Sequence, residues 1–568
     1  MIIGLDVGGT NTDVVLIGND RILRQTKVPT DHSNLFESVW TGLDEITRDV
    51  PSASIGRAVL STTLTTNAIV EKKLAATGMI VCSGPGIDPE LFRTNDHYFC
   101  VSGSIDHRGR EIQPIDPKEI REIASRWRAE GLKQAGIVGK FSVRNPKQEL
   151  EIREILGDDF DFVALGHRLS GNLGFPRRIA TAYLNASVYP IHRRFFDAVR
   201  DSLDKKGLHI PIYILKADGG TMSLESSMEY PGQTILSGPA ASVMGSLPFA
   251  SASEETLVLD IGGTTTDMAV LIRRAPLLDP LGIELSGHKT LIRSLKTRSI
   301  GLGGDSAVRF VEGNLVIGPD RQGPPMVYGG PVPTPTDALV VLGEFSDGDR
   351  GASFEGLKPL ADQLGMSLEK AADHIFNQAC QTVMEAAAKM IADINSKPVY
   401  TVHEILEGYQ VQPKEALVLG GPAPAFASRF AALNDFRVRV VPQWQVANAI
   451  GAALAKSTSE VTLFADTEQG VAVAPEENFS QSVKRDFDKK GAVKLAFDLL
   501  RKKCIKQGAT EGEVEMEVLE ELQFNMVRGF YTTGRNIRVK VQVKPGLIPE
   551  YQEIAGTLFN DDSLPGTL

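Results

Sequence analysis

A nine-residue segment that occurs twice is the feature that most constrains this chain. The segment Leu5–Asp13, LDVGGTNTD, recurs about 250 residues later as Leu259–Asp267, LDIGGTTTD, and seven of the nine positions are identical. Each copy lies between two short apolar runs, which is the pattern of a β-hairpin with a turn rich in Gly and Thr. The spacing is too long for a solenoid, so it indicates two similar domains in tandem, each opening with the same hairpin.

Strand and helix patterns alternate around and between the two copies. Asp116–Glu119 is a helix start, with an N-cap, a Pro at the first position and a Glu at the third. Apolar runs predict buried strands at Ala135–Phe141 and Phe160–Leu165, and apolar spacing predicts a long helix near 367–395. This alternation predicts an α/β fold.

The C-terminal part has a different composition. It is more charged, and it combines a helix-like stretch, Lys489–Gln507, with strand-like alternation at Asn536–Val543. We therefore expect a small α+β domain at this end. The expected organisation is a first lobe over 1–190, a second lobe over 191–455 with a Pro/Gly-rich insertion near 318–337, and the C-terminal domain over 456–568.

Composition excludes several classes of protein. Lys and Arg total 60 against 71 Asp and Glu, a net charge of −11, whereas a nucleic-acid-binding surface needs a basic face. We find no run of apolar residues long enough for a membrane span, and the N-terminus lacks the basic region of a signal peptide. The four cysteines are far apart and form no Cys-x-x-Cys pair, which fits a cytoplasmic protein without disulfides. We therefore expect neither nucleic acid nor a membrane as a partner.

The duplicated turn has a physical use. Glycines let backbone N–H groups approach an anion closely, Thr hydroxyls can donate to phosphate oxygens, and an Asp at the strand end can hold Mg²⁺. Two facing hairpins would thus clamp a triphosphate, with Asp6 and Asp260 as magnesium-linked carboxylates and Asp13 and Asp267 as further catalytic candidates. A plain Gly-rich turn is the alternative, but it does not explain the near-duplicate. The candidate phosphate-binding residues are Gly8, Gly9, Thr10, Asn11, Thr12, Gly262, Gly263, Thr264, Thr265 and Thr266.

Two further glycine clusters leave alternatives open. Gly420, Gly421 and Pro422 follow an apolar strand, and they form either a backbone floor beneath an adenine ring or the first turn of a helix. The cluster Gly303–Asp305, comprising Gly303, Gly304 and Asp305, either contacts phosphate or ribose or permits tight packing. Ser237–Gly245 opens a helix of small residues that is suited to close contact at an interdomain hinge.

The order of these motifs resembles the actin-like ATPase and sugar-kinase superfamily, and within it the hydantoinase A/oxoprolinase family. That family includes N-methylhydantoinase, oxoprolinase and the acetone and acetophenone carboxylases. The resemblance covers roughly residues 1–455. The segments that carry it are Asp6–Asp13, Thr62–Ala68, Ser237–Gly245, Asp260–Asp267, Gly301–Ser306, Thr336–Ala338 with Leu342–Gly343, and Leu419–Pro422.

The resemblance implies two tandem actin-like (ribonuclease H-like) lobes around a cleft for ATP and Mg²⁺. It also implies phosphorylation of a cyclic amide carbonyl (hydantoin, oxoproline or lactam) for ring opening, commonly with a second, hydantoinase B-like subunit. On the matching positions, Gly420 and Gly421 become adenosine contacts. The chain departs from the family pattern at Asn11, where Phe is usual, and at Asp305, where Gly or Ser is usual and where Asp could add a metal or ribose contact. These departures weaken the inference of the substrate more than the inference of ATP use.

Four functions remain open from the sequence. The leading hypothesis is an ATP-dependent amidohydrolase subunit, and the second is the ATP-using subunit of a ketone carboxylase. A small-molecule kinase would need a general base near the γ-phosphate, and a non-catalytic ATP-switched activator would bind ATP without small-molecule stimulation. Thr62, Thr63 and Asn67 are expected to face the cleft, whereas His167 could either reach the cleft or pack in the core.

Overall fold

The computed structural model describes residues 1–18, 21–31, 34–279, 281–396 and 409–548. The first lobe is built on a sheet of strands β1 (Ile2–Val7), β2 (Asn11–Ile17), β3 (Ile22–Pro29), β4 (Arg57–Thr62), β11 (Ile212–Leu215) and β12 (Thr221–Ser223). Their order is β12–β11–β4–β1–β2–β3. β1 pairs antiparallel with β2 and parallel with β4, so the predicted hairpin is the centre of the sheet.

The second lobe repeats this arrangement. Its sheet consists of β13 (Glu255–Ile261), β14 (Thr266–Ile272), β15 (Ala275–Pro276), β18 (Thr297–Ile300), β21 (Glu415–Leu419) and β22 (Arg437–Val440). β13 pairs antiparallel with β14 and parallel with β21, as β1 does with β2 and β4. The registers also agree, because Asp6 pairs with Asp13 and Asp260 pairs with Asp267. The sequence repeat is therefore a repeat of structure, as predicted.

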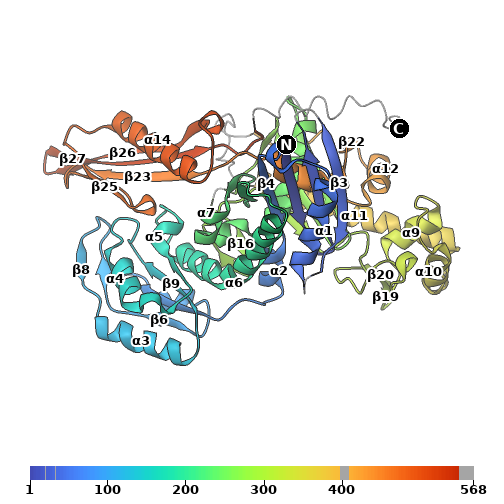
Figure 1. Ribbon diagram of the computed structural model, residues 1–568, viewed down its shortest axis with the longest axis horizontal. Coiled ribbons are helices and arrows are strands. Elements are labelled where there is room, and N and C mark those ends of the chain that lie inside the picture. Colours follow the sequence, from blue (N-terminus) through green and yellow to red (C-terminus); the bar gives the residue numbers. More distant parts are fainter. Residues whose placement is uncertain (19–20, 32–33, 280, 397–408, 549–568) are drawn as a thin grey trace.

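Helices pack on both sheets, namely α1 (Leu35–Thr47) on the first and α11 (Leu368–Asn395) and α12 (Ala423–Leu433) on the second. In the first lobe, α6 (Phe175–Lys205) packs on α1, and α2 (Leu64–Val70) packs on α6. In the second lobe, α9 (Pro335–Leu342) and α10 (Arg350–Leu364) pack on α11 and lie away from the sheet (Figure 1). The long helix expected near 367–395 is thus confirmed as α11, with Ser367 as its N-cap. We find no described helix long and apolar enough to cross a membrane.

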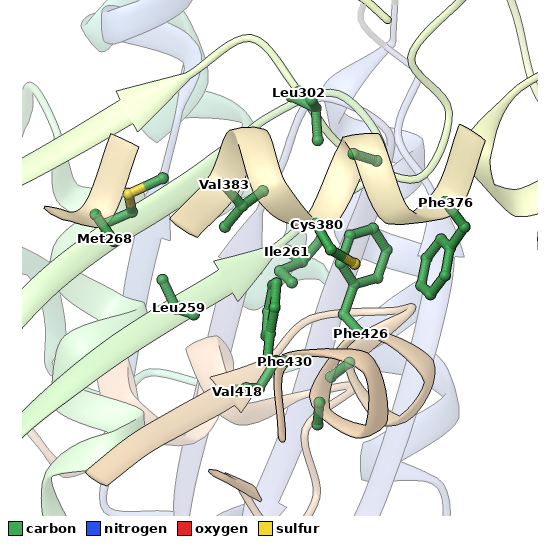
Figure 2. Packing of buried hydrophobic residues seen from close by; sticks show 14 of the residues in the cluster. Leu259, Ile261, Met268, Leu302, Phe376, Cys380, Val383, Val418, Phe426 and Phe430 are labelled. Carbon is green, nitrogen blue, oxygen red and sulfur yellow. The ribbon is translucent and has the colours of Figure 1, made fainter. Parts of the chain in front are cut away.

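The core of the second lobe shows why α11 lies where it does. Its apolar face packs on β13 and β14 beside α12, and the rings of Phe376 and Phe426 meet edge to face with centroids 4.8 Å apart. This dense contact holds the second hairpin from one side. Figure 2 labels Leu259, Ile261, Met268, Leu302, Phe376, Cys380, Val383, Val418, Phe426 and Phe430 of this core.

Two helices of small residues cross between the lobes, namely α8 (Ser237–Ser246) and α13 (Ala447–Leu454). Every residue of α8 is buried. A Cβ added at Gly245 would lie 2.2 Å from the Ala447 carbonyl oxygen, and one added at Gly451 would lie 2.2 Å from that of Ala241. The predicted small-residue helix is therefore a close backbone contact at the junction of the lobes.

An α/β unit is inserted between α2 and α6. Its parallel sheet contains β5 (Thr77–Cys82), β6 (Tyr98–Cys100), β9 (Gln134–Gly139) and β10 (Phe162–Leu165), and its helices include α3 (Pro117–Ala129), α4 (Lys147–Leu156) and α5 (Gly166–Leu169). Asp116 caps α3, as predicted. The predicted boundary at 190/191 falls inside α6, and β11 and β12 still belong to the first sheet. We infer that the first lobe extends to β12.

The C-terminal residues form an α+β unit of β23 (Glu460–Asp466), β24 (Val471–Ala474), β25 (Phe479–Ser482), α14 (Lys489–Lys506), β26 (Met516–Arg528) and β27 (Tyr531–Val543). It lies beside the inserted unit in Figure 1. The guanidinium of Arg144 stacks 3.3 Å from the ring centroid of Phe464, and Arg108 pairs with buried Asp466 at 2.9 Å. These contacts join the inserted unit to the C-terminal unit.

The remaining elements are short and lie elsewhere in the chain. They are α7 (Leu224–Glu229), β7 (Ser104–Ile105), β8 (Glu111–Gln113), β16 (Glu284–Leu285), β17 (His288–Lys289), β19 (Val308–Val311) and β20 (Asn314–Ile317).

The crossing of α8 and α13 gives a test of the fold. Gly451→Ala should lower the free energy of unfolding by about 1–3 kcal/mol, because the new methyl group would overlap the α8 backbone. Gly512→Ala is the matched control, since a Cβ there meets no atom within 4 Å. Urea unfolding of both variants is the measurement. Equal stability of the two variants would contradict the close contact.

Candidate functional site

The two hairpin turns lie on the wall of one cleft of about 1370 Å³. The turns have the same geometry, because Gly8 N–H donates to the Asn11 carbonyl at 3.0 Å and Gly262 N–H donates to the Thr265 carbonyl at 2.9 Å. The glycines leave backbone exposed toward the cleft. The predicted residues that line it are Asp6, Gly8, Gly9, Thr10, Asn11, Asp13, Asp260, Gly262, Gly263, Thr264, Thr265, Asp267, Asp305, Gly420, Gly421 and Pro422.

The two threonines that end the turns are a correction to the predicted phosphate-binding set. Thr12 is fully buried and its hydroxyl lies 3.0 Å from that of Thr30. Thr266 is also fully buried, and its hydroxyl donates to the Leu302 carbonyl at 2.7 Å. Side chains alternate along a strand, so the residue next to a cleft-facing Asp points to the other side.

Gly303 and Gly304 lie outside the cleft wall, which corrects their prediction as cofactor contacts. The N–H of Gly304 donates to the Gly262 carbonyl at 2.9 Å, and that of Asp305 donates to the Gly263 carbonyl at 2.7 Å. A Cβ at Gly303 would lie 2.5 Å from the Gly262 carbonyl oxygen. The two glycines therefore pack tightly against the second hairpin and brace it, whereas Asp305 of the same loop lines the cleft.

Asp6, Asp13, Asp260 and Asp267 gather at the floor of the cleft. Burial, together with the nearby charges of Asp13 and Asp260, raises the pKa of Asp6 to about 7. Burial and the charge of Asp260 likewise raise the pKa of Asp267 to about 7. The pKa of Asp260 is raised by burial as well, although Ser242 and Asn448 partly oppose this by hydrogen bonding. The raised pKa values mean that the cationic groups near these carboxylates do not fully offset the cost of burying their negative charge.

Asn448 and Ser242 hold this floor in place from the two crossing helices. Asn448 Nδ2, on α13, donates to Asp260 Oδ2 at 3.1 Å, and its hydrogen bonding also lowers the pKa of Asp6. The hydroxyl of Ser242, on α8, donates to the same Asp260 oxygen. The helix crossing therefore positions the carboxylates of both hairpins.

The floor has the chemistry of a site for a hydrated divalent cation. Asp6 Oδ1 is buried and, within the described residues, has no hydrogen-bond partner. The same part of the chain contains no cluster of three Asp, Glu, His or Cys side chains that could hold a metal ion by itself. Mg²⁺ is commonly bound by one or two carboxylates, with water and substrate phosphates completing its octahedron, so the residues fit that ion.

Of the two predicted alternatives for the third glycine loop, the structure shows the helix start, while the contact with adenine stays a prediction. Gly420 has a φ of +94°, and a Cβ there would lie 2.2 Å from the Ile261 carbonyl oxygen, so this position requires glycine. Pro422 is the N-cap of α12, so the loop is a helix start. It also lines the cleft, and a Cβ on Gly421 would meet no atom within 4 Å.

The structure also shows where the four other polar residues considered from the sequence lie. Thr63 and Asn67 line the cleft as expected, whereas Thr62 is buried behind the wall. His167 packs in the inserted unit, where its Nδ1 lies 2.6 Å from Glu149 Oε2, so the packing interpretation is correct.

Two cations of the cleft were missed because tertiary contacts alone place them. Lys27, on β3, pairs with its cross-strand neighbour Asp13. Arg321 pairs with Asp305 at 3.0 Å. Neither residue belongs to a glycine motif.

Two family models and several known proteins match the amino-acid sequence of this chain. The model described as "Hydantoinase/oxoprolinase N-terminal region" matches residues 2–159, and the model "Hydantoinase/oxoprolinase" matches residues 178–461. Caprolactamase subunit alpha of Pseudomonas jessenii is 23% identical over 489 residues, which are 78% of this chain and 68% of that protein. The acetophenone carboxylase gamma subunit of Aromatoleum aromaticum is 25% identical over 484 residues, 74% of this chain and 63% of that protein.

Solved structures give the same picture of the fold. A nucleotide-free acetone carboxylase chain matches with a TM-score of 0.72 and 18% identity, over 97% of this chain and 88% of that one. The ATP-dependent caprolactamase of Pseudomonas jessenii matches with a TM-score of 0.69, also at 18% identity, with the same coverage of both chains. The likeness therefore includes most of the C-terminal unit, for which the sequence motifs offered no match.

The raised pKa of Asp6 predicts a pH effect on stability. Its folded-state pKa of about 7 lies above 3.8, the ordinary value for an Asp side chain and the one expected in the unfolded chain. The contribution of Asp6 to stability is therefore complete at low pH and is lost as pH rises toward 7. In metal-free protein, Asp6→Asn should therefore gain stability relative to wild type between about pH 4 and pH 7, and keep a constant advantage above pH 7.

Urea unfolding in the presence of a chelator is the measurement. Asp158→Asn controls for the loss of one charge, because the Asp158 side chain is fully exposed. Parallel pH profiles for wild type and Asp6→Asn would contradict the burial of an unpaired carboxylate.

Proposed function

The chain belongs to the hydantoinase/oxoprolinase family, and we propose that it is the ATP-using subunit of an amidohydrolase that opens a cyclic amide. The observation that carries this proposal is the pair of hairpins with matching strand registers, whose turns line one cleft above a floor of carboxylates. Such a pair offers backbone donors to a triphosphate from both sides. Relatives named caprolactamase subunit alpha and 5-oxoprolinase 1 act, by their names, on cyclic amides.

We assign the cleft residues to parts of the nucleotide. The turn residues of both hairpins would bind the phosphates, and Gly420 and Gly421 would lie against adenosine. Asp6 and Asp260 would hold Mg²⁺ through water. That ion would neutralise phosphate charge, and it would also satisfy the unpartnered oxygen of Asp6.

The proposed chemistry is phosphoryl transfer followed by hydrolysis. The amide carbonyl oxygen attacks the γ-phosphorus, the bond from that phosphorus to the bridging oxygen breaks, and ADP leaves. Water then adds to the activated carbon, and the ring C–N bond breaks as the nitrogen takes up a proton, which leaves an amine and an acyl phosphate. A second water hydrolyses the acyl phosphate to a carboxylate and free phosphate. A carbonyl oxygen carries no proton to remove, so the first step needs no general base.

A kinase would need one of the floor carboxylates as a general base. Asp13 is in an ion pair with Lys27, which opposes that role, whereas Asp267 has its pKa raised to about 7 and is able to accept a proton from a hydroxyl. Substitution of Asp267 therefore helps to distinguish a kinase from an amidohydrolase. Phosphoryl transfer to a carbonyl oxygen uses the cleft mainly for positioning and charge stabilisation.

A ketone carboxylase subunit is the second candidate, because an acetone carboxylase chain shares the fold over 97% of this chain. In that reaction, a ketone enolate or bicarbonate would take the phosphoryl group instead. Relatives whose names describe them as alpha, beta or gamma subunits support a second subunit as the partner of this chain in either case.

ADP release from Mg-ATP, measured with a panel of small molecules, tests the proposal. We expect stimulation by one class of hydantoin, 5-oxoproline or lactam, with one ADP formed for each ring opened once the partner subunit is present. Stimulation by a ketone with bicarbonate would overturn the amidohydrolase assignment in favour of the carboxylase. ATP binding with no stimulation by any compound, even with the partner, would favour an ATP switch.

A further inference from the structure

Arg321 reaches across the mouth of the cleft from one lobe to the other. It lies in the Pro/Gly-rich insertion of the second lobe, yet its Nη1 donates to Thr10 Oγ1, in the first hairpin turn, at 2.7 Å. Its Nη2 lies 3.0 Å from Asp305 Oδ2, and its Nε donates to the Gly323 carbonyl at 3.1 Å. One guanidinium group therefore contacts the first phosphate loop and the loop that braces the second.

Asp305 places this guanidinium beside the second hairpin as well. A Cβ added at Gly263 would lie 2.5 Å from Asp305 Oδ2, the oxygen that pairs with Arg321. The backbone of Asp305 is fixed, because its N–H donates to the Gly263 carbonyl at 2.7 Å. Arg321 thus lies between the tips of both turns, where a phosphate chain clamped by the turns would pass.

The insertion that carries Arg321 is itself anchored. Buried Asp337 accepts hydrogen bonds from the N–H groups of Met326 at 3.0 Å and Val327 at 2.9 Å. On the other side of Arg321, the N–H of Ala307 donates to the Asp320 carbonyl at 3.0 Å. The backbone on both sides of Arg321 is therefore held, and the side chain alone needs to move.

Charge also distinguishes Arg321 from the other cations of the cleft. Among described residues, the cationic side chains that line it are Lys27, Lys73 and Arg321. Lys27 is paired with Asp13 on the floor, and Lys73 is exposed and pairs with Glu71 at 2.6 Å. Arg321 is largely buried, with 23% of its side chain exposed, and its fork of donors matches the geometry of phosphate oxygens.

We propose that Arg321 is a catalytic residue that stabilises the transferring phosphoryl group and is held by Asp305 until a nucleotide enters. This inference rests on the proposed use of ATP but not on the identity of the acceptor. Phosphate oxygens would replace Thr10 and Asp305 as acceptors of its N–H groups. An arginine supplied by the same chain stabilises the charge that develops on the equatorial oxygens during transfer.

The test compares binding of two nucleotide states to Arg321→Gln, so that it needs no acceptor. Mg-ADP alone represents the ground state, and Mg-ADP with aluminium fluoride represents the planar phosphoryl group. We expect Arg321→Gln to bind Mg-ADP within about threefold of wild type, and to lose roughly 10²–10³-fold in affinity for the aluminium fluoride complex. ATP turnover should fall by a similar factor with KM for ATP little changed.

Matched variants separate catalysis from structure. Arg309→Gln removes another arginine of the same region, one that pairs with Asp320 outside the cleft wall, and it should bind both states like wild type. Arg321→Lys keeps the charge without the fork and should recover part of the aluminium fluoride affinity. Asp305→Asn should retain that affinity, because Asp305 holds Arg321 only before nucleotide binds.

Three outcomes would overturn the inference. Arg321→Gln could keep aluminium fluoride affinity within about threefold of wild type, which would leave Arg321 as a contact between the lobes. It could lose affinity equally for both states, which would make Arg321 a ground-state binding residue. If wild type itself bound neither state, the proposed use of ATP would fail and this inference with it. Thermal unfolding of each variant checks that the fold is intact.

Discussion

The unpaired negative charge at the floor of the cleft is the constraint on which the rest of the structure depends. Two identical strand registers bring Asp6 and Asp260 to the same level, and burial raises the pKa of both. A folded chain tolerates such a cluster when the surroundings fix it and when protonation or a bound cation removes part of the charge. The glycine turns, the crossing helices and the bracing loop around Gly303 all serve to hold these carboxylates in one place.

The helix crossing shows how packing and function are joined. Because Gly245 and Gly451 let two backbones approach closely, α8 and α13 can each present one polar side chain, Ser242 and Asn448, to Asp260. Both lobes contribute strands to the cleft, and these helices lie between them. Movement of one lobe against the other would therefore act on the carboxylates directly, which is how domain closure can be coupled to phosphoryl transfer.

Local patterns in the sequence predicted the hairpins, α11 and the helix of small residues, because glycine content and apolar spacing act over short distances. The orientation of Thr12 could also have been predicted, since it adjoins Asp13 on a strand and must face the other side. The sequence left the packing role of Gly303 as one of two alternatives, and it did not show the contacts of Arg321 and Asn448. Those two residues contact Thr10 and Asp260, which lie far away in the sequence and which only the assembled lobes bring together.

Mg-ATP turnover by Asp6→Asn and Asp260→Asn tests most directly whether the two hairpins form one nucleotide clamp. The account predicts that each substitution alone abolishes turnover while circular dichroism stays native-like and thermal unfolding stays cooperative. Asp158→Asn, at a fully exposed carboxylate, should retain turnover. Wild-type turnover in either floor variant would contradict the account, because it would remove that hairpin from the site.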